Sequence, residues 1–437
     1  MQALLSFDRA PPFGAPLRFF LTAPAFAVLA GLLLLWSGPD LFASRWTPEA
    51  LALTHLITAG FMLQTMLGAL FQLLPVVAGA NMVRPLFVAR LVHAALTVGT
   101  LLLVAGFLTY EPLAFRFAVL FLGAGATLFI AAAGHALHGI PATSPTIRGL
   151  RLALIGLAVT VAFGLLLAAS LGWSLALPLA QLTDIHLGWG FVAWGCALLA
   201  AVGYVVVPMF QMTPSYPGWF GKHFARLVLG VAALWTVADL AGWTLPSAML
   251  GAAVVLCAAA FAVVTLSIQW RSKRAKLDPT QVYWRVAMFS ALAACGLWLA
   301  ASALPALAEW RGWPLLFAAL LLLGGFVSVI VGMLYKIVPF LVWLHLQNLG
   351  RGRVPAPNMK KVLAETQMRK QMYAHFAAVV LFLGAVVWPQ WLTYPAGAAL
   401  VAANAWLARN LLSALGVYRR HLVQIAAALD VPLAGVL

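Results

Sequence analysis

Two histidines inside apolar segments carry the side chains best suited to hold a metal ion or a haem iron. His55 and His186 each lie near the start of a hydrophobic segment, and their residue numbers differ by 186 − 55 = 131. An ionisable side chain is costly to place in an apolar medium, so such a residue is a candidate for function. Because imidazole nitrogen binds both haem iron and copper, we take His55 and His186 as the primary candidate ligands.

The residues that follow His55 at helical spacing form a stripe of small, polar and sulfur-bearing side chains. Its members are Thr58, Ala59, Met62, Met66, Ala69 and Gln72. Thioether sulfur suits a soft copper ion or a haem iron, so Met62 and Met66 join His55 as candidate cofactor-binding residues. The alternative is a buried histidine that bonds a helix carbonyl or Glu49, with the methionines as packing.

The face that follows His186 consists of small residues, with Gly190, Ala193 and Ala197 on it. Small residues allow another helix, or a flat ring, to approach closely. Asp184 is near enough in sequence to orient the imidazole, as carboxylates do for many ligand histidines. Close packing of two helices is the alternative explanation for this face.

The other candidate residues give weaker signals. His135 and His138 form an H-x-x-H pair that can chelate a metal if both lie on one helical face. Lys336 lies in an apolar segment and either snorkels to the surface or belongs to a proton path. Structural roles are expected for two further sets of residues, the histidines His93, His223 and His375 and the cysteines Cys196, Cys257 and Cys295.

Twelve apolar segments must position these side chains. The chain has 437 residues, of which 64% are hydrophobic and 8% charged, as in integral membrane proteins. A spanning helix needs about 20 apolar residues. Segments of this kind are centred near residues 27, 63, 98, 124, 160, 195, 234, 258, 295, 326, 382 and 404. We predict an all-α integral membrane fold of twelve transmembrane helices.

One short pattern, an aromatic residue followed by three residues and a proline, occurs three times. The prolines are Pro75, Pro208 and Pro339, and their residue numbers differ by 208 − 75 = 133 and by 339 − 208 = 131. Long internal repeats are typical of multi-helix membrane domains. The pattern predicts one membrane domain, 1–437, built of three four-helix pseudo-repeats, 1–145, 146–277 and 278–437, with a hydrophilic cytoplasmic connector at 346–373.

The net charge of +16 is distributed unevenly over the loops. Alternate loops are rich in arginine and lysine, most clearly at 271–276 and 351–370, while the opposite loops carry acidic residues. Under the positive-inside rule this pattern puts both termini in the cytoplasm, as expected for a multi-pass protein of a bacterial-type inner membrane. Loop charge accounts for the basic residues, so the lipid bilayer is the expected partner and nucleic acid is not. Residues 1–16 lack the features of a secretory signal, so we expect the first apolar run to be a retained span.

The twelve spans, the three repeats and the histidines at the outer ends of the second and sixth helices together resemble the catalytic subunit of the haem-copper oxidase superfamily and its NnrS-like relatives. The resemblance covers the whole chain as architecture. In the family, the second helix carries a low-spin haem ligand, which corresponds to His55, and the sixth carries a copper ligand, which corresponds to His186. The resemblance implies haem b and copper as cofactors.

The ligand set of that family is incomplete in this chain. The H-x-H of the tenth helix is absent, because no histidine occurs between His223 and His345, and no histidine pair lies between Ala238 and Ala248. Gly190 stands where the family has a tyrosine one turn beyond the histidine of the sixth helix. The full binuclear centre cannot form by the family's rule, so oxygen reduction is not expected.

We therefore expect a membrane protein that binds haem b, copper or both in its outer half and serves electron transfer, gas sensing or nitric-oxide metabolism. Any enzymatic activity would be that of an oxidoreductase, with a respiratory-chain electron donor as partner. The sequence is also compatible with a homo-oligomer. The alternatives are a transporter or permease, suggested by the internal repeats, and a metal-free accessory or assembly subunit of a respiratory complex.

Overall fold

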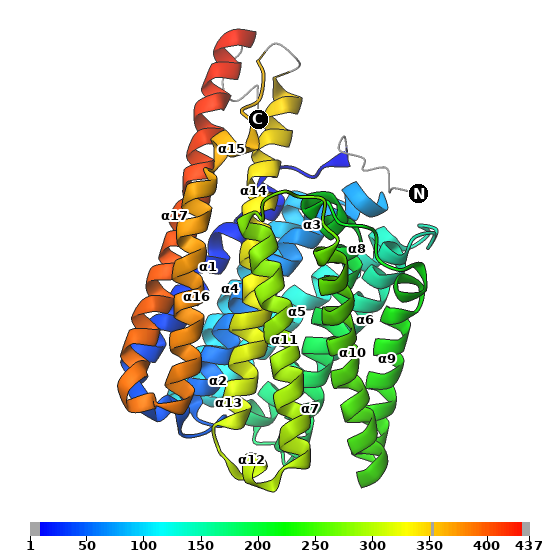
Figure 1. Ribbon diagram of the computed structural model, residues 1–437, viewed down its shortest axis with the longest axis vertical. Helices are drawn as coiled ribbons and strands as arrows, with labels where there is room; N and C mark the ends of the chain where they lie inside the picture. Colours follow the sequence, from blue (N-terminus) through cyan, green and yellow to red (C-terminus); the bar gives the residue numbers. More distant parts are fainter. Residues whose placement is uncertain (1–8, 351–353, 431–437) are drawn as a thin grey trace.

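The computed structural model describes residues 9–350 and 354–430, and these residues form helices and loops without any strand. Twelve helical spans are long and apolar enough to cross a membrane. All twelve segment centres expected from the hydropathy of the sequence fall inside these spans. The prediction of an all-helical chain with twelve potential transmembrane helices is therefore confirmed. The spans run side by side along the long axis of the molecule (Figure 1).

Three of the spans form the interior, and we call them the inner helices. They are α2–η3–α3 (Pro48–His55, Leu56–Leu63, Gln64–Ala78), α7–η4–α8 (Leu179–Gly188, Trp189–Cys196, Ala197–Gln211) and α13–η5–α14 (Trp313–Ala319, Leu320–Val327, Ser328–Leu349). Their most apolar stretches are 78, 72 and 72% buried, compared with 22 to 56% for the other nine spans. The inner helices therefore have protein on nearly every side, while the others present apolar side chains outward, as a lipid environment requires.

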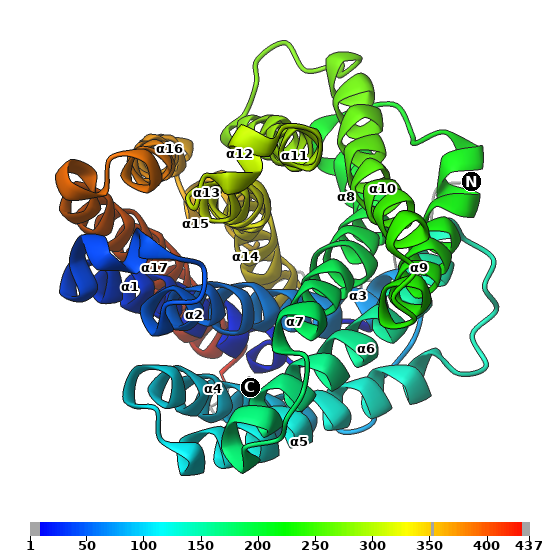
Figure 2. The ribbon, with the colours of Figure 1, turned by 90° about the horizontal axis from the view of Figure 1, so that it is seen from below.

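The other nine spans form a closed ring around the inner helices. In ring order they are α1 (Gly14–Ser37), α4 (Pro85–Thr109), α5 (Pro112–Leu137), α6 (Pro145–Trp173), α9 (Gly218–Leu240), α10 (Thr244–Trp270), α11 (Pro279–Ala303), α16 (Glu365–Val387) and α17 (Pro389–Leu429). Each contacts the next, and α17 contacts α1. Seen along the bundle, these helices surround the inner ones (Figure 2).

Glycines allow the first and last spans to close the ring. A Cβ atom at Gly31 of α1 would lie 2.8 Å from Cγ2 of Val401, and one at Gly397 of α17 would lie 2.9 Å from Cγ of Leu35. Real Cβ atoms do not approach so closely, so the two backbones meet only because both positions lack a side chain.

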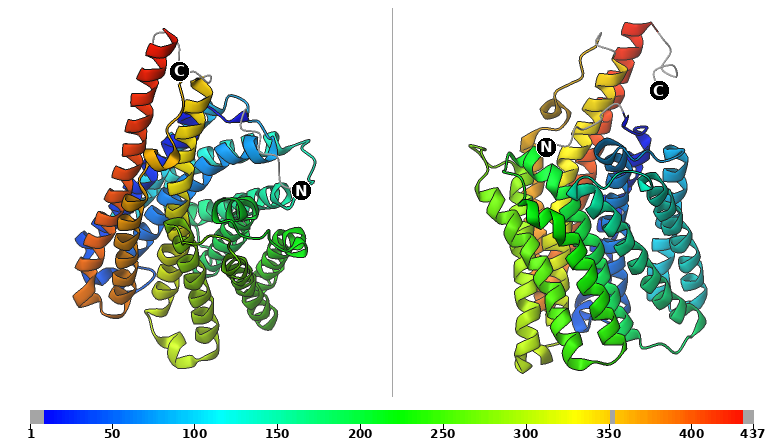
Figure 3. Two further views of the ribbon diagram at one scale, coloured as in Figure 1. Left: turned by 45° about the horizontal axis from the view of Figure 1, so that its top comes forward. Right: turned by 90° about the vertical axis from the view of Figure 1, so that its right-hand side faces the viewer.

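Two helices extend well beyond the rest of the bundle. α17 has 41 residues, which at about 1.5 Å per residue is about twice the thickness of a bilayer core. It projects together with the end of α14 at the end of the molecule where α15 (Met359–Val362) lies (Figures 1 and 3). The predicted connector at 346–373 contains the end of α14, α15 and the start of α16, while its basic residues Arg351 and Arg353 lie outside the described residues. The opposite end carries the short helices η2 (Gly38–Ala43) and α12 (Pro305–Glu309), and we call it the α12 end.

Each inner helix contains one π-helical segment of eight residues, η3, η4 or η5. These segments begin at Leu56, Trp189 and Leu320, so their starts differ by 189 − 56 = 133 and by 320 − 189 = 131 in residue number. The prolines of the repeated pattern have the same two intervals, and they lie inside α3, α8 and α14 rather than after the ends of these helices. Since π-helical turns are rare and occur often at functional sites, their recurrence directs attention to the inner helices.

Candidate functional site

His55 is the last residue of α2 and directly precedes η3. Its Nδ1 atom lies 2.8 Å from the carbonyl oxygen of Leu51. A carbonyl can only accept, so Nδ1 carries the hydrogen and donates, and the neutral ring presents the lone pair of Nε2. The ring is half-buried and lies 5.2 Å from the ring of Phe107 on α4, measured between centroids. His55 therefore has the fixed tautomer typical of a histidine ligand.

His186 on α7 is held in the same way, but by a neighbouring helix. Its Nδ1 atom donates to the carbonyl oxygen of Thr160 on α6 at 3.0 Å, which again leaves the lone pair on Nε2. The ring lies against Gly164, where a Cβ atom would come within 2.9 Å of Cε1 of the imidazole. The absence of a side chain at Gly164 thus makes the space that the half-buried ring occupies.

The structure places both histidines at the α12 end. His55 ends α2 and His186 lies in α7, which are the first segments of their inner helices. An ion pair joins the segments that carry them, because Nη1 of Arg45, in the loop before α2, lies 2.9 Å from Oδ1 of Asp184 on α7. Asp184 therefore binds Arg45, and the partner that orients His186 is the carbonyl of Thr160 rather than the expected carboxylate.

The two histidines do not occupy corresponding positions of the inner helices. The starts of η3 and η4 differ by 189 − 56 = 133 in residue number, so the position that corresponds to His55 is Gly188, two residues beyond His186. Gly188 packs against Trp235 of α9, which a Cβ atom there would strike. Two residues turn a helix by about 200°, so His186 faces α6 instead of α9.

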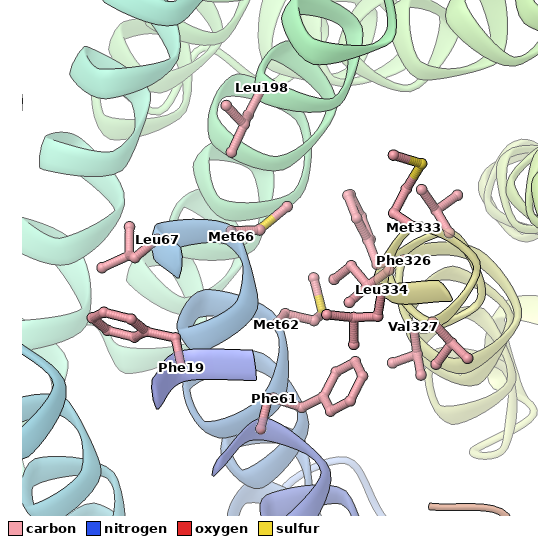
Figure 4. Close-up of a cluster of buried hydrophobic side chains, with 14 of the residues drawn as sticks. Phe19, Phe61, Met62, Met66, Leu67, Leu198, Phe326, Val327, Met333 and Leu334 are labelled. Atoms are coloured by element: carbon pink, nitrogen blue, oxygen red, sulfur yellow. The ribbon is translucent and has the colours of Figure 1, made fainter. Parts of the chain in front are cut away.

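Met62 and Met66 follow His55 along the first inner helix, in the interior of the bundle. Both are buried, with exposed fractions of 5 and 8%, and they project from the first inner helix toward the helix that carries Met333 (Figure 4). The expected stripe assumed a continuous α-helix, but η3 takes about one more residue per turn. The residues beyond η3 therefore present a different face from the one a continuous α-helix would give, and the role of Met62 and Met66 as ligands together with His55 stays a prediction.

His135 and His138 lie one turn apart at the end of α5. α5 ends at Leu137, and His138 is its C-cap residue, with φ −63° and with its backbone N–H bonded to the carbonyl oxygens of Gly134 and His135. Both side chains are exposed. Among the described residues no third histidine, cysteine or carboxylate joins them, so a metal site at this pair stays a prediction.

The three recurring histidines differ in role. His93 Nε2 lies 2.8 Å from Oγ1 of Thr22, and His375 Nε2 lies 2.8 Å from Oγ of Ser328, while His223 is exposed. His375 is only 1% exposed, and Ser328 is the first residue after η5. A structural role is thus supported for His93 and His375, but recurrence along the chain did not imply one common contact.

Lys336 forms an ion pair that sequence reasoning missed. Its Nζ atom lies 2.8 Å from Oδ2 of Asp278, and Nη1 of Arg274 lies 3.1 Å from the same oxygen. Asp278 also caps α11 by accepting a hydrogen bond from the backbone N–H of Gln281. Lys336 is therefore tied to the beginning of α11 rather than extended freely to the surface. The Asp-Pro start of α11 was the available signal for the cap, but the sequence could not show which lysine would reach it.

Two of the three cysteines converge although they come from different helices. Cys196, Cys257 and Cys295 are all buried and free. Cys196 and Cys295 line an apolar cavity of about 70 Å³. Within the described part of the chain, however, no three histidine, cysteine, aspartate or glutamate residues are arranged to hold a metal ion.

No protein-family model matches this chain, and no curated protein matches it. The interpretation of the site therefore rests on its geometry. Two half-buried imidazoles, each with Nδ1 bonded to a backbone carbonyl and with Nε2 as its basic nitrogen, lie at the same end of a helical bundle. Such a pair can bind an iron or another metal that obtains its remaining ligands elsewhere.

Proposed function

We propose that this protein binds b-type haem between α2 and α7, with His55 and His186 as the residues that hold the iron. The proposal assigns it a role in electron transfer or in nitric-oxide or gas-related respiratory metabolism, without full oxidase turnover. Haem would supply a one-electron redox centre or a site for a diatomic gas. The respiratory-chain electron donor expected from the sequence belongs to the same proposal.

The observation that carries the proposal is that both imidazoles have the same tautomer and the same kind of hydrogen-bond partner. In both, a backbone carbonyl accepts from Nδ1, so the proton is kept away from Nε2 and the ring orientation is fixed. A structural histidine can satisfy one nitrogen in this way, but two such rings on segments joined by the Arg45–Asp184 ion pair suit a common metal.

Haem fits this pair better than copper does. A haem iron already has four porphyrin nitrogens and needs at most two protein ligands, which is the number available here. A copper ion bound by protein alone needs a third donor, and among the residues described no third histidine, cysteine or carboxylate lies in range. The surrounding side chains also suit an apolar macrocycle, because Phe107 and Phe115 pack edge to face beside His55, with ring centroids 5.3 Å apart.

Repetition along the chain supports the wider proposal of a haem-copper-oxidase-like scaffold. We propose three pseudo-repeats with both termini in the cytoplasm of a bacterial-type inner membrane. Three inner helices, each with a π-helical segment and a proline at matching intervals, are what three related units would produce. The positive charge of the loops supports the orientation, because it puts the histidine pair in the outer half.

A permease is the second candidate, and one observation favours it. A cavity of about 120 Å³ lies between the inner helices α3, α8 and α14, in the half of the bundle away from the α12 end. Substrate-binding sites of many transporters lie between such repeats. A protein without haem whose unfolding temperature rises with a substrate would fit this candidate.

The test is an optical spectrum of the purified protein, oxidised and then reduced with dithionite, with iron and copper measured on the same sample. We expect a Soret band, a reduced α-band and about one iron per chain. His55→Ala and His186→Ala should each abolish or shift these bands. His223→Ala serves as the control, because His223 is exposed on α9 and should leave the spectrum unchanged. A colourless, iron-free protein after expression with ample haem would refute the proposal.

A further inference from the structure

Two arginines, Arg18 of α1 and Arg90 of α4, lie where these two ring helices contact each other. A Cβ atom at Gly14 would be 3.7 Å from Nη2 of Arg18 and 3.7 Å from Cδ1 of Leu86, so the guanidinium group of Arg18 lies beside Leu86. Leu86 comes one helical turn before Arg90, and residues four apart lie on the same face of a helix. Arg18 therefore points toward the part of α4 that carries Arg90.

A hydrogen bond one turn further along the two helices fixes their register. Oγ1 of Thr22 lies 2.8 Å from Nε2 of His93. Thr22 is four residues after Arg18, and His93 is three residues after Arg90. Because both helices begin at the end of the bundle opposite the α12 end, the two arginines lie at the same level along it. Contacts between α1 and α4 thus flank the arginine pair on both sides.

No carboxylate among the described residues balances the charge of this pair. From residue 9 to residue 110 the chain has only two acidic residues, Asp40 and Glu49, and both lie at the α12 end. Nε of Arg18 donates to the carbonyl oxygen of Gly14 at 2.9 Å, which directs the guanidinium toward the beginning of α1, while Arg90 is exposed. Two neighbouring cations without an acidic partner attract an anion.

An apolar stripe continues from each arginine toward the α12 end. Leu29 follows Arg18 by 29 − 18 = 11 residues, and Leu101 follows Arg90 by 101 − 90 = 11 residues. Eleven residues make about three turns, so each leucine lies on the same helical face as its arginine and about 16 Å deeper. The two leucines are 40 and 44% exposed. Two cations above two exposed apolar stripes match the charge and the length of a phospholipid.

We propose that the contact between α1 and α4 is the binding site of one anionic phospholipid, with its phosphate between Arg18 and Arg90 and its acyl chains along the two stripes. Guanidinium groups bind phosphate through paired N–H···O bonds. Basic sites between membrane-spanning helices are known to hold anionic headgroups. A choline headgroup would bring a third positive charge next to the two arginines, so an uncharged glycerol headgroup fits better.

The experiment is a lipid titration of the full-length protein in detergent, followed by native mass spectrometry. The probes are phosphatidylglycerol, phosphatidylcholine and inorganic phosphate. We expect one phosphatidylglycerol to bind about tenfold more tightly than any further lipid and about tenfold more tightly than phosphatidylcholine. Phosphatidylglycerol should also raise the temperature of unfolding, because it binds the folded state, whereas inorganic phosphate at the same concentration should not.

Variants separate this site from a general attraction of basic loops for anionic lipids. Arg18→Gln and Arg90→Gln should each weaken binding of the first phosphatidylglycerol by about tenfold. Both side chains contact one phosphate in the proposal, so the double variant should lose less than the product of the two single losses. Arg226→Gln is the matched control, because Arg226 is exposed near the beginning of α9, elsewhere in the ring, and it should bind lipid like the unchanged protein. Equal unfolding temperatures without lipid would show that all variants fold.

Four results would overturn the proposal. An equal loss in Arg226→Gln, or strictly independent losses at Arg18 and Arg90, would assign lipid binding to overall charge. Equal protection by inorganic phosphate would assign the arginines to a free anion. Asp8 lies outside the described residues, and tighter lipid binding by Asp8→Asn would make that carboxylate their partner instead. None of these readouts involves the Soret band, so the outcome is independent of the haem proposal.

Discussion

Nη1 of Arg45 and Oδ1 of Asp184 lie 2.9 Å apart, and this ion pair joins the segment before His55 to the helix that carries His186. The side chains are 32 and 50% exposed, so water and salt screen the attraction. Such pairs contribute about 0–1 kcal/mol to stability. The ion pair therefore matters more for the relative position of the two histidines than for the stability of the bundle.

Arg45→Gln and Asp184→Asn should consequently separate the two effects. We expect the temperature of unfolding, followed by intrinsic tryptophan fluorescence, to change little, because the lost free energy is about 1 kcal/mol or less. Haem content per chain should fall in both variants. The doubly reversed variant, Arg45→Asp with Asp184→Arg, should recover part of it. An unchanged haem content in both single variants would contradict a positioning role.

Gly164→Ala should disturb the histidine site without harming the helix. The new Cβ atom would lie 2.9 Å from Cε1 of His186, so the imidazole must move, and we expect the Soret band to weaken or shift. Gly230→Ala is the matched control, because Gly230 also lies inside a helix and a Cβ atom there meets nothing within 4 Å. Both substitutions gain up to about 1 kcal/mol of helix propensity, so a difference between their spectra isolates the contact with His186. Equal spectra in the two variants would show that the ring of His186 is not involved.

Asp278→Ala should destabilise the bundle more than Lys336→Met. Asp278 caps α11 and pairs with both Lys336 and Arg274, so its removal loses a cap and leaves Lys336 without its partner, at a cost of about 2 kcal/mol or more. Lys336→Met leaves the cap and the Arg274–Asp278 ion pair in place, so it should cost less than Asp278→Ala. The thermal unfolding midpoint checks this order, with Glu365→Ala as the control for an exposed ion pair. The reverse order would show that the lysine has a role beyond this ion pair.

Ser328→Ala and His375→Ala should give coupled rather than additive losses. Ser328 donates to the carbonyl oxygen of Leu323 at 3.0 Å, so its hydroxyl oxygen accepts from Nε2 of His375. Either single variant leaves a buried group unpaired, at about 1–3 kcal/mol. The double variant removes both groups, so its loss should be smaller than the sum of the two by at least about 0.5 kcal/mol. Simple additivity in a double-mutant cycle would indicate that the hydrogen bond contributes nothing.

Hydropathy was sufficient to find the spans, because the thickness of a bilayer dictates the length of each apolar segment. The spacing of the three prolines along the sequence is likewise the same as the spacing of the three π-helical segments in the structure. The sequence did not show which spans lie in the interior of the bundle, because the inner and outer helices have similar hydropathy in this chain. Burial of the inner helices depends on contacts between residues far apart in sequence.

The candidate residues could be chosen from the sequence, but their arrangement could not. His55 and His186 were chosen because ionisable residues are rare in apolar segments. The stripe through Met66 extended α-helical spacing through Leu56–Leu63, because nothing in the sequence there marks a π-helix. The convergence of Cys196 and Cys295 on one cavity depends on the order of helices in the ring, which local patterns do not encode.

The π-helical segments also affect how this chain should be aligned with other proteins. A relative whose second span is an uninterrupted α-helix would need one residue fewer between Pro48 and Gln64 to bring Met66 and Gln72 to the same place. A one-residue gap opposite Leu56–Leu63 in such an alignment would then reflect the π-helical segment, and the residues on both sides of the gap would still be correctly paired. Conversely, an ungapped alignment through this stretch would pair residues that face different neighbours.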